Sequence, residues 1–285
     1  MNELLARYRQ LSLVGRWIAW HVIVYVAWQL LEVLFNLMMV RPESVNGWIA
    51  LSSDLLTVAT RPWTLASYIF LHANLWHLLI NMLMLYFSGT LFLRYYYPRQ
   101  FQTLYLMGGI AGGLFYVAAY NLFPLLSSMD GSIVIGASGA VMCILFAVAV
   151  SRPDERVRMI FVGEVKMIWL ALFILLMDLL ALAGSNAGGH FAHLGGALLG
   201  VLFAVRMRKG KDITAATSHL IDLLHQWTQR PIRVAYKRKP SEWKETKPST
   251  SQAEINKILE KIKQSGYGSL SNEEKAQLFS SNKKG

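Results

Sequence analysis

Six stretches of the sequence are apolar over a length that suits a membrane-spanning helix. They lie near 17–40, 70–93, 102–123, 133–150, 166–183 and 190–205. A helix needs about 20 apolar residues to cross the hydrocarbon core of a bilayer, and several of these stretches are shorter, which is tolerable where protein surrounds the helix. The first stretch is too long for the apolar part of a cleavable signal. The pattern therefore predicts an all-α membrane protein built as a six-helix bundle.

The composition agrees with a membrane protein and excludes most soluble classes. The chain has 285 residues, of which 54% are hydrophobic and only 16% charged. That balance is too apolar for an ordinary soluble domain. The single cysteine, Cys143, excludes an internal disulfide.

Positive charge is concentrated on alternate connections between the apolar stretches. The charged connections carry Arg7, Arg9 and Arg16; Arg94 and Arg99; Arg152, Arg156, Arg158 and Lys166; and Arg206, Arg208 and Lys209. The connections 124–132 and 184–189 carry no Lys or Arg, and the longer 41–69 carries two. Because Lys and Arg favour the cytoplasmic side, both termini are expected in the cytoplasm.

The charge and hydropathy patterns divide the chain into four parts. We expect a cytoplasmic N-terminal segment at 1–16, a membrane domain at 17–205, a basic juxtamembrane helix and linker at 206–250, and a helical hairpin at 251–285. Nine Lys or Arg against two Asp between 206 and 240 predict contact with anionic lipid headgroups. Nucleic acid is not expected as a partner, although the same charge would attract it.

The tail combines short helical patterns with a linker. Apolar residues at helical spacing predict a helix near 213–228. Residues 251–254 form a capping-box pattern before an apolar stripe, which consists of Ile255, Ile258, Leu259 and Ile262. A second capping box at 271–274 opens a helix through Phe279. So small a cytoplasmic hairpin is expected to dock on the membrane or on an unknown partner.

Two polar residues stand at the heads of apolar stretches. Ser138 is flanked by glycines in 135–141, and His193 precedes paired glycines in 191–196. Polar groups in hydrocarbon are costly, so they indicate a function. In the expected topology Ser138 lies about five residues into the fourth helix and His193 about three into the sixth, both near the outer ends. A neutral imidazole can take the proton of a serine hydroxyl and so activate it as a nucleophile.

The second apolar stretch supplies further polar groups at the same outer end. His72, His77 and Asn81 are expected to open the second helix, and His77 and Asn81 are four residues apart on one face. They are candidate donors to an oxyanion, together with the backbone N–H of Ser138. Glycines four apart predict close helix packing, in the pairs Gly108–Gly112, Gly109–Gly113 and Gly196–Gly200.

These motifs together resemble the rhomboid intramembrane serine proteases over about 17–205. Residues 136–139 read Gly-Ala-Ser-Gly, like the GxSG motif of the family's fourth helix, and residues 192–200 fit the AHxxGxxxG motif of its sixth. His72, His77 and Asn81 fit the pattern of its second helix. The resemblance implies that Ser138 is the nucleophile and His193 its general base in a dyad. It also implies that His77, Asn81 and the Ser138 amide form the oxyanion hole.

The resemblance also implies an activity and a location. The family cleaves the transmembrane helices of single-span membrane proteins near their outer end, as serine endopeptidases. The tail is similar to a short motif appended to some bacterial rhomboids, so we expect a multi-pass protein of a bacterial inner (plasma) membrane. We expect no cofactor and no metal.

The sequence departs from the family at one point and leaves two residues to interpret. The first external loop often carries Trp-Arg in the family, whereas Trp63 is followed by Thr64 here, with Arg61 two residues earlier. We interpret His190 as a loop-edge residue. Asp178 is expected to bond loop amides rather than to act as a third catalytic residue, because a dyad needs no acid.

Two other functional classes stay open. A catalytically inactive rhomboid-like module for binding or quality control would be expected to lack Ser138 or His193, and both are present. A six-span transporter would need a polar path, and the inner halves of the apolar stretches offer almost no polar residues.

Overall fold

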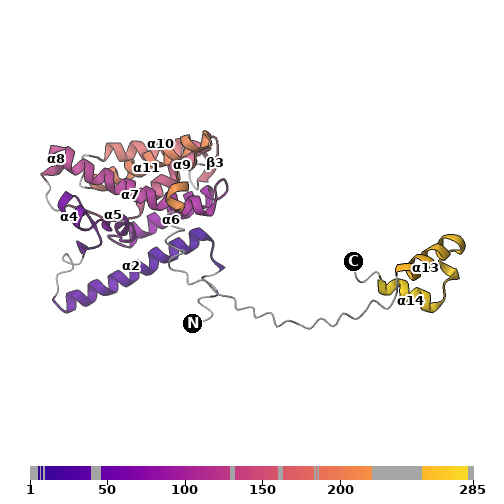
Figure 1. The fold of residues 1–285 in the computed structure, drawn as a ribbon. Helices are drawn as coiled ribbons and strands as arrows, with labels where there is room; N and C mark the ends of the chain where they lie inside the picture. The colour runs from indigo at the N-terminus through magenta and orange to yellow at the C-terminus, as the bar shows by residue number, and fades with distance from the viewer. Residues whose placement is uncertain are drawn as a thin grey trace. The chain divides into compact units, whose positions relative to one another are not determined.

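The computed structural model describes residues 6, 8, 10–39, 46–128, 132–159, 163–182, 184, 186–219 and 252–281. The chain divides into two compact units, residues 1–230 and 231–285. Within the described part, the first unit is built on six longer helices, shown in Figure 1: α2 (Leu13–Leu37), α6 (Leu75–Phe92), α7 (Pro98–Leu122), α9 (Ser138–Ser151), α10 (Met167–Leu180) and α11 (Ala187–Arg208). These helices match the six predicted spans, and the all-α membrane bundle is confirmed.

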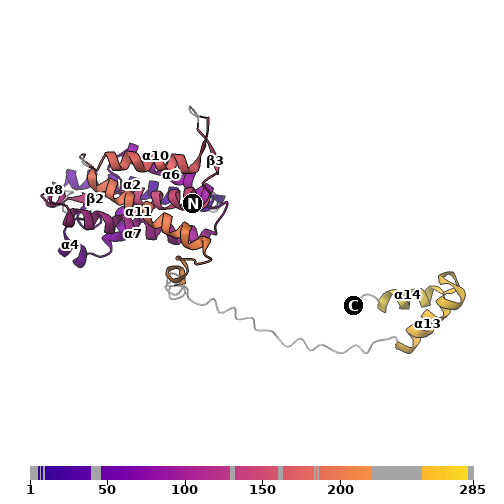
Figure 2. The same ribbon diagram turned by 90° about the horizontal axis from the view of Figure 1, so that it is seen from above.

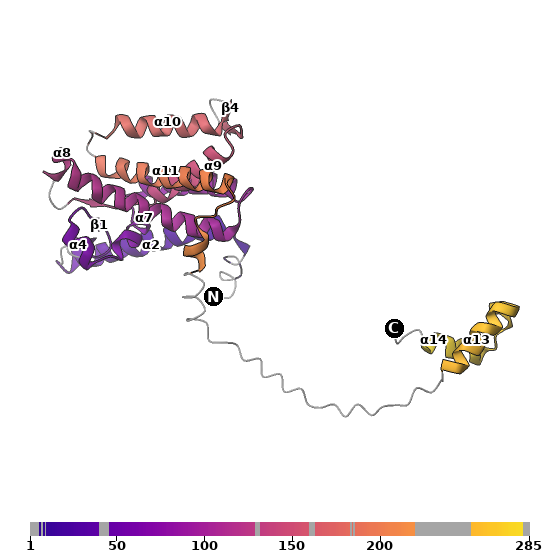
Figure 3. The ribbon, with the colours of Figure 1, turned by 45° about the horizontal axis from the view of Figure 1, so that its top comes forward.

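The six helices differ in length and in surroundings. Within the described residues, α2, α6, α7 and α11 are long and apolar enough to cross a membrane, whereas α9 and α10 have 14 residues each. Residues 139–149 of α9 are all buried, so this short helix is enclosed by protein. In contrast, α10 exposes large apolar side chains such as Trp169 and Phe173. Figure 3 shows α10 along one side of the bundle and α2 along the other.

The fourth helix begins later than the apolar pattern predicts. The predicted span starts at 133, but Ile133–Val134 form strand β2, which pairs antiparallel with β1 (Leu51–Ser52). Helix α9 starts at Ser138, which is therefore its first residue rather than its fifth. A short apolar run does not distinguish a buried strand from a helix, and here the pairing with β1 decides it.

Two further helix starts differ from the expectation. Helix α11 begins at Ala187, so His193 is its seventh residue rather than its third. Helix α6 begins at Leu75 with Asn74 as its N-cap, so His72 lies in the preceding loop. Before that loop come three short helices, α4 (Leu55–Thr60), α5 (Thr64–Ser67) and η1 (Tyr68–Phe70), and α8 (Pro124–Ser127) follows α7.

Glycines bring α9 and α11 into backbone contact. A Cβ added at Gly196 would overlap the carbonyl oxygen of Gly139, and one added at Gly200 would overlap that of Cys143. On α7, a Cβ at Gly108 would overlap the Cys143 side chain, and one at Gly112 would lie 2.7 Å from the Ala192 carbonyl oxygen. The predicted small-residue packing is thus present, with α9 held between α7 and α11.

The connections rich in Lys and Arg gather at one end of the bundle. Arg94, after α6, pairs with Glu155, after α9, at 3.5 Å. Gln100, at the start of α7, donates to Asp212, beyond α11, at 2.8 Å. At the opposite end of α7, near connections that are poor in Lys and Arg, Asn121 donates to the Ser53 carbonyl at 2.9 Å. This arrangement agrees with the alternation of charge from which the topology was predicted.

A strand hairpin extends the connection between α9 and α10. Strands β3 (Arg156–Met159) and β4 (Gly163–Lys166) pair antiparallel, with Arg156 opposite Lys166. Figure 2 shows this hairpin projecting from the end of α10.

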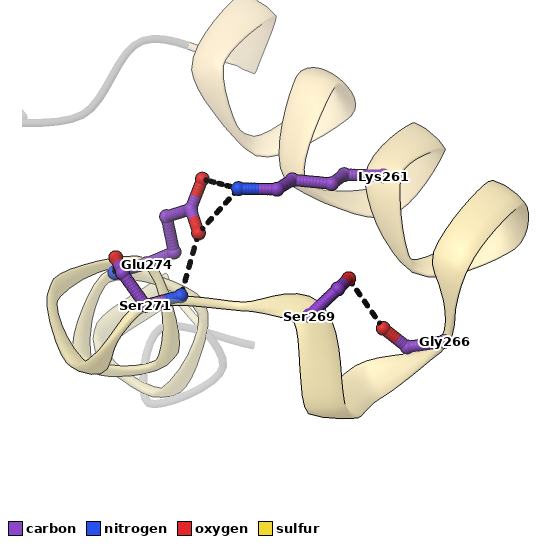
Figure 4. Close-up of polar contacts among 5 residues, drawn as sticks. All are labelled: Lys261, Gly266, Ser269, Ser271 and Glu274. Carbon is purple, nitrogen blue, oxygen red and sulfur yellow. Dashed lines mark hydrogen bonds and ion pairs between the residues drawn. The ribbon is translucent and has the colours of Figure 1, made fainter.

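The second unit contains the helical hairpin that the tail sequence predicts. Helix α13 (Gln252–Ser265), the short η2 (Tyr267–Ser269) and α14 (Asn272–Ser281) follow one another. Figure 4 shows the predicted capping box at Ser271, in which the Ser271 N–H donates to Glu274 at 2.7 Å and the Glu274 N–H donates to the Ser271 hydroxyl at 3.2 Å. Hydrogen bonds from Lys261 and from the Ser271 amide hold the pKa of the Glu274 carboxyl below its usual value.

Other parts of the tail prediction are only partly described. The apolar stripe of α13 buries Ile258, whereas Leu259 is 49% exposed. The helix predicted near 213–228 begins with a turn at 213–214 and is helical at 215–219. Its remaining residues, 220–228, lie outside the described residues, as do Ser251 and most of the predicted linker.

We expect Gly196→Ala to lower the thermal stability of the protein in detergent. The added Cβ meets a backbone oxygen of α9, so the helices must separate, and overpacking of this kind costs about 1–3 kcal/mol. Thermal unfolding measures the effect, and the matched control is Gly268→Ala, where a Cβ would meet nothing within 4 Å. An unchanged melting temperature for Gly196→Ala would contradict the packing argument.

Candidate active site

The loop before α9 fixes the position of Ser138. Strand β2 ties residues 133–134 to β1, and the Gly136 N–H then donates to the Tyr68 carbonyl at 3.0 Å. Gly136 has φ +127°, a conformation that residues with a side chain rarely adopt. This turn ends at Ala137, and Ser138 opens the helix with its backbone N–H in the first turn. First-turn N–H groups have no partner within their own helix, so this end of α9 can receive negative charge.

The contact between α9 and α11 brings Ser138 and His193 to one place. A Cβ at Gly139, the residue after Ser138, would lie 3.0 Å from the carbonyl oxygen of Ala192, the residue before His193. Ser138 and His193 are both half-buried and both line one cavity of about 730 Å³. The two residues that the sequence singles out therefore share a site.

His77 presents a hydrogen-bond donor to the same cavity. It is the third residue of α6, and its Nδ1 accepts the backbone N–H of Ala73 at 3.3 Å. A neutral ring with an accepting Nδ1 carries its proton on Nε2. A Cβ at Gly136 would lie 2.8 Å from that Nε2 and 3.9 Å from the Ser138 hydroxyl oxygen, so both side chains border this glycine.

Asn81 lies one turn further along α6 and is buried. Its side-chain amide donates to the His77 carbonyl at 2.8 Å, and the side chain also lines the cavity. An amide nitrogen has two hydrogens, so the bond to the helix backbone leaves one for a ligand in the cavity.

The cavity is lined by polar and by apolar side chains. Besides the four residues above, Asp178 and Asn186 supply polar atoms. The apolar walls come mainly from α6, α9 and α10, with Ile80, Met84, Met142, Phe173, Ile174 and Met177.

Asp178 does not have the role that the sequence predicts for it. One oxygen of its carboxyl, Oδ1, lies 2.8 Å from Nδ1 of His193 and 2.7 Å from Nδ1 of His190. The expectation that Asp178 bonds loop amides is wrong, because its described bonds go to these two rings. His190 is likewise not at a loop edge but is the fourth residue of α11, one turn before His193.

This contact determines the tautomer of His193. An ionised carboxylate only accepts hydrogen bonds, so the Nδ1 atom that faces Asp178 carries the proton. The acceptor lone pair of the neutral His193 ring is then on Nε2. This pairing was not predicted from the sequence, although the spacing of three residues between His190 and His193 places both on one helix face.

A second group of histidines lies behind the cavity. His21 of α2 is fully buried, and its Nε2 is 2.9 Å from the hydroxyl of Tyr105. The ring of His72 packs edge-on against His21, at 5.6 Å between centroids, and against His77 at 5.2 Å. His72 was predicted from the sequence to lie near the site, whereas His21 was not.

Arg61 has a clear structural place in the connection between α2 and α6. Its guanidinium lies 4.0 Å from the ring centroid of Trp48 and donates to the Gly47 carbonyl at 2.7 Å. Trp63 stacks on Trp48 and donates to its carbonyl at 2.8 Å. The arginine two residues before Trp63 thus holds this loop together, although Thr64 occupies the position after the tryptophan.

Two family descriptions match parts of the chain. The Rhomboid domain matches residues 59–210, which include every residue that lines the cavity. A family of unknown function, DUF6576, matches residues 244–282, which cover the helical hairpin of the second unit.

Curated proteins are also similar to the chain. RHOMBOID-like protein 12, mitochondrial, of Arabidopsis thaliana is 32% identical over 159 residues, which cover 52% of this chain and 47% of that protein. Rhomboid protein 1, mitochondrial, of Saccharomyces cerevisiae is 31% identical over 152 residues, covering 50% and 41%. The chain spans about half the length of these relatives or less.

Proposed function

Because the chain belongs to the rhomboid family, we propose that it is a serine endopeptidase that cleaves other membrane proteins within the bilayer. The protein itself is an integral membrane protein, since four of its described helices are long and apolar enough to span. The observation that carries the proposal is the shared cavity, in which Ser138 and His193 lie with two side-chain donors.

The reaction begins with proton transfer from the serine. Nε2 of His193 takes the proton of the Ser138 hydroxyl, and the oxygen attacks the scissile carbonyl carbon. The carbonyl oxygen becomes an oxyanion. It is stabilised by hydrogen bonds from the Ser138 N–H, Nε2–H of His77 and the Asn81 amide. The positive end of the α9 dipole favours the same charge.

Collapse of the tetrahedral intermediate completes the first half of the reaction. The carbon–nitrogen bond breaks, and the imidazolium of His193 returns its proton to the leaving amine. The acyl group remains on Ser138 as an ester. A water molecule, deprotonated by His193, then attacks that ester and releases the second product.

Asp178 acts in this scheme as a positioning residue. By accepting Nδ1–H of His193 at 2.8 Å, it holds the tautomer whose Nε2 is free to accept a proton. It also stabilises the imidazolium that forms during attack. The proposal therefore adds an acidic partner to the dyad that the sequence predicts.

The substrate class follows from the cavity and the bilayer. Peptide bonds in a membrane helix are protected by their own hydrogen bonds, so a substrate must unwind locally before Ser138 reaches it. Single-span membrane proteins with small or helix-breaking residues near one end of the helix satisfy this condition. The site lies at the end of the bundle away from the connections rich in Lys and Arg, and this supports a location on the outer side of the membrane.

The same charge argument supports the orientation and the lipid contacts. We propose that both termini face the cytoplasmic side of a bacterial inner membrane, with the basic residues after α11 against anionic lipid. The relatives named above are mitochondrial proteins, so the compartment rests on the tail and its charge rather than on them.

Ser138→Ala should abolish cleavage of a transmembrane reporter substrate, because the nucleophile is lost. A fall of about 10⁶-fold in kcat is typical of such a loss. Cleavage in proteoliposomes measures it, with thermal unfolding as the check on folding. His193→Ala should in addition prevent labelling of Ser138 by a fluorophosphonate probe, whereas His219→Gln, outside the site, should leave labelling intact. If the Ser138→Ala variant cleaved normally, the protein would use another nucleophile or the catalytically inactive alternative would hold.

Asp178→Asn should lower kcat by about 10²-fold or more, with little change in KM. The neutral amide no longer stabilises the imidazolium and can present its NH₂ group to Nδ1, which favours the wrong tautomer. Steady-state kinetics in detergent test this, and the melting temperature shows whether the fold survives. A loss of stability with unchanged kcat would mean that Asp178 only holds α10 against α11.

His77→Ala and Asn81→Ala should each reduce kcat by about 10²–10³-fold and leave KM nearly unchanged, because the oxyanion exists only in the transition state. The double variant should lose less than the product of the two effects, since neighbouring donors act together. The measurement is kinetics on folded variants in detergent. An effect on KM alone would indicate that these residues shape the cavity and that the oxyanion is stabilised elsewhere.

A further inference from the structure

Asp178, His190 and His193 present three metal-ligating atoms to one another. The carboxylate oxygen and the two Nδ1 atoms all lie within 4.8 Å of one another, and the two imidazole rings stand at 85°. The side chains come from two helices, with Asp178 on α10 and both histidines on α11.

The donor set suits a zinc ion. Zn²⁺ binds imidazole nitrogen at about 2.0–2.1 Å and carboxylate oxygen at about 2.0–2.2 Å, and three protein ligands commonly leave a fourth position for water. The present oxygen–nitrogen contacts of 2.7 and 2.8 Å are hydrogen-bond distances, so the three side chains would move apart slightly around an ion.

The second carboxylate oxygen gives an independent reason to expect a cation. Oδ2 of Asp178 is buried and has no hydrogen-bond partner among the described residues. A buried carboxylate oxygen without a partner is unfavourable, and a cation bound by both oxygens would satisfy it. Asp178 and His193 line the cavity, and the side chains of His190 and His193 are 21% and 22% exposed, so an ion can reach the three ligands.

We propose that Asp178, His190 and His193 form a binding site for Zn²⁺ that inhibits the protein reversibly. This inference rests on the proposed function, because His193 is its general base. A metal ion at Nδ1 of His193 takes the lone pair of that nitrogen. The proton that Nδ1 carried in the free protein moves to Nε2 through water, and the ring stays neutral.

The metal-bound tautomer cannot act as the base. With Nε2 protonated, no lone pair is available for the Ser138 hydroxyl proton, and Asp178 is withdrawn from Nδ1 to the ion. Zinc would thus stop the reaction without taking part in the chemistry and without occluding the cavity. Removing the ion restores the original tautomer.

The binding experiment uses the full chain without a histidine tag, in detergent, stripped of metal with a chelator. Zn²⁺ is titrated in competition with a chromogenic chelator against the Ser138→Ala variant, which retains all three ligands. We expect one strongly bound zinc ion, and an affinity at least about tenfold weaker in Ser138→Ala/His190→Gln. His219→Gln in the same background is the matched control, since it removes an exposed histidine outside the site, and it should bind normally.

The activity experiment uses the chain with Ser138 in place. Zn²⁺ should inhibit reporter cleavage, a chelator should reverse the inhibition, and Mg²⁺, which prefers oxygen ligands, should not inhibit at the same concentration. His190→Gln should keep most of its metal-free activity, because the glutamine amide can still donate to Asp178, and should resist zinc by about tenfold or more.

The two experiments separate this inference from the proposed function. Zinc binding that depends on His190 in a protein without protease activity would overturn only the proposed function. Absence of strong zinc binding, or equal binding with and without His190, would overturn the metal site even if proteolysis is normal.

Discussion

The backbone contact between α9 and α11 is the constraint on which the site depends. In lipid the hydrophobic effect does not drive helices together, so close packing must hold them. Gly196 and Gly200 allow carbonyl groups of α9 to touch α11 directly, and Gly139 allows the Ala192 carbonyl of α11 to approach α9. Ser138 and His193 are each next to a residue of this contact, so the register of the two helices sets the separation of the proposed nucleophile and the proposed base. A shift of one residue would rotate one of them away from the cavity.

A second constraint comes from the low polarity around the site. Three of the polar side chains there have described partners: the Ala73 N–H for His77, the His77 carbonyl for Asn81, and Asp178 for His193. These partners satisfy groups that would otherwise be costly to bury, and they also assign the protons. His77 becomes a donor and His193 an acceptor toward the same cavity because their Nδ1 atoms meet opposite partners, a backbone N–H in one case and a carboxylate in the other.

Much of this architecture could be predicted from the sequence, because apolar length and the alternation of positive charge are local signals. The residues of the site could be named for the same reason, as polar exceptions in apolar runs. The start of α9 could not, since residues 133–134 are apolar enough for a helix and only the pairing with residues 51–52 makes them a strand. The role of Asp178 could not either, because it depends on how α10 faces α11 across a short loop, which no periodicity encodes.

The pairing of Asp178 with two histidines links chemistry to regulation through a single nitrogen atom. Whatever occupies Nδ1 of His193 decides the state of Nε2, because a neutral imidazole has one proton to place. A proton at Nδ1, held by the carboxylate, leaves Nε2 with the lone pair that the proposed base needs, whereas any group that takes the Nδ1 lone pair makes Nε2 a donor. His190 adds the second nitrogen that a metal ion needs and lies one turn away on the same helix, bound to the same oxygen. The contact of Asp178 with both histidines would make His193 an effective base. The same contact brings together the three ligands through which zinc would inhibit the protein.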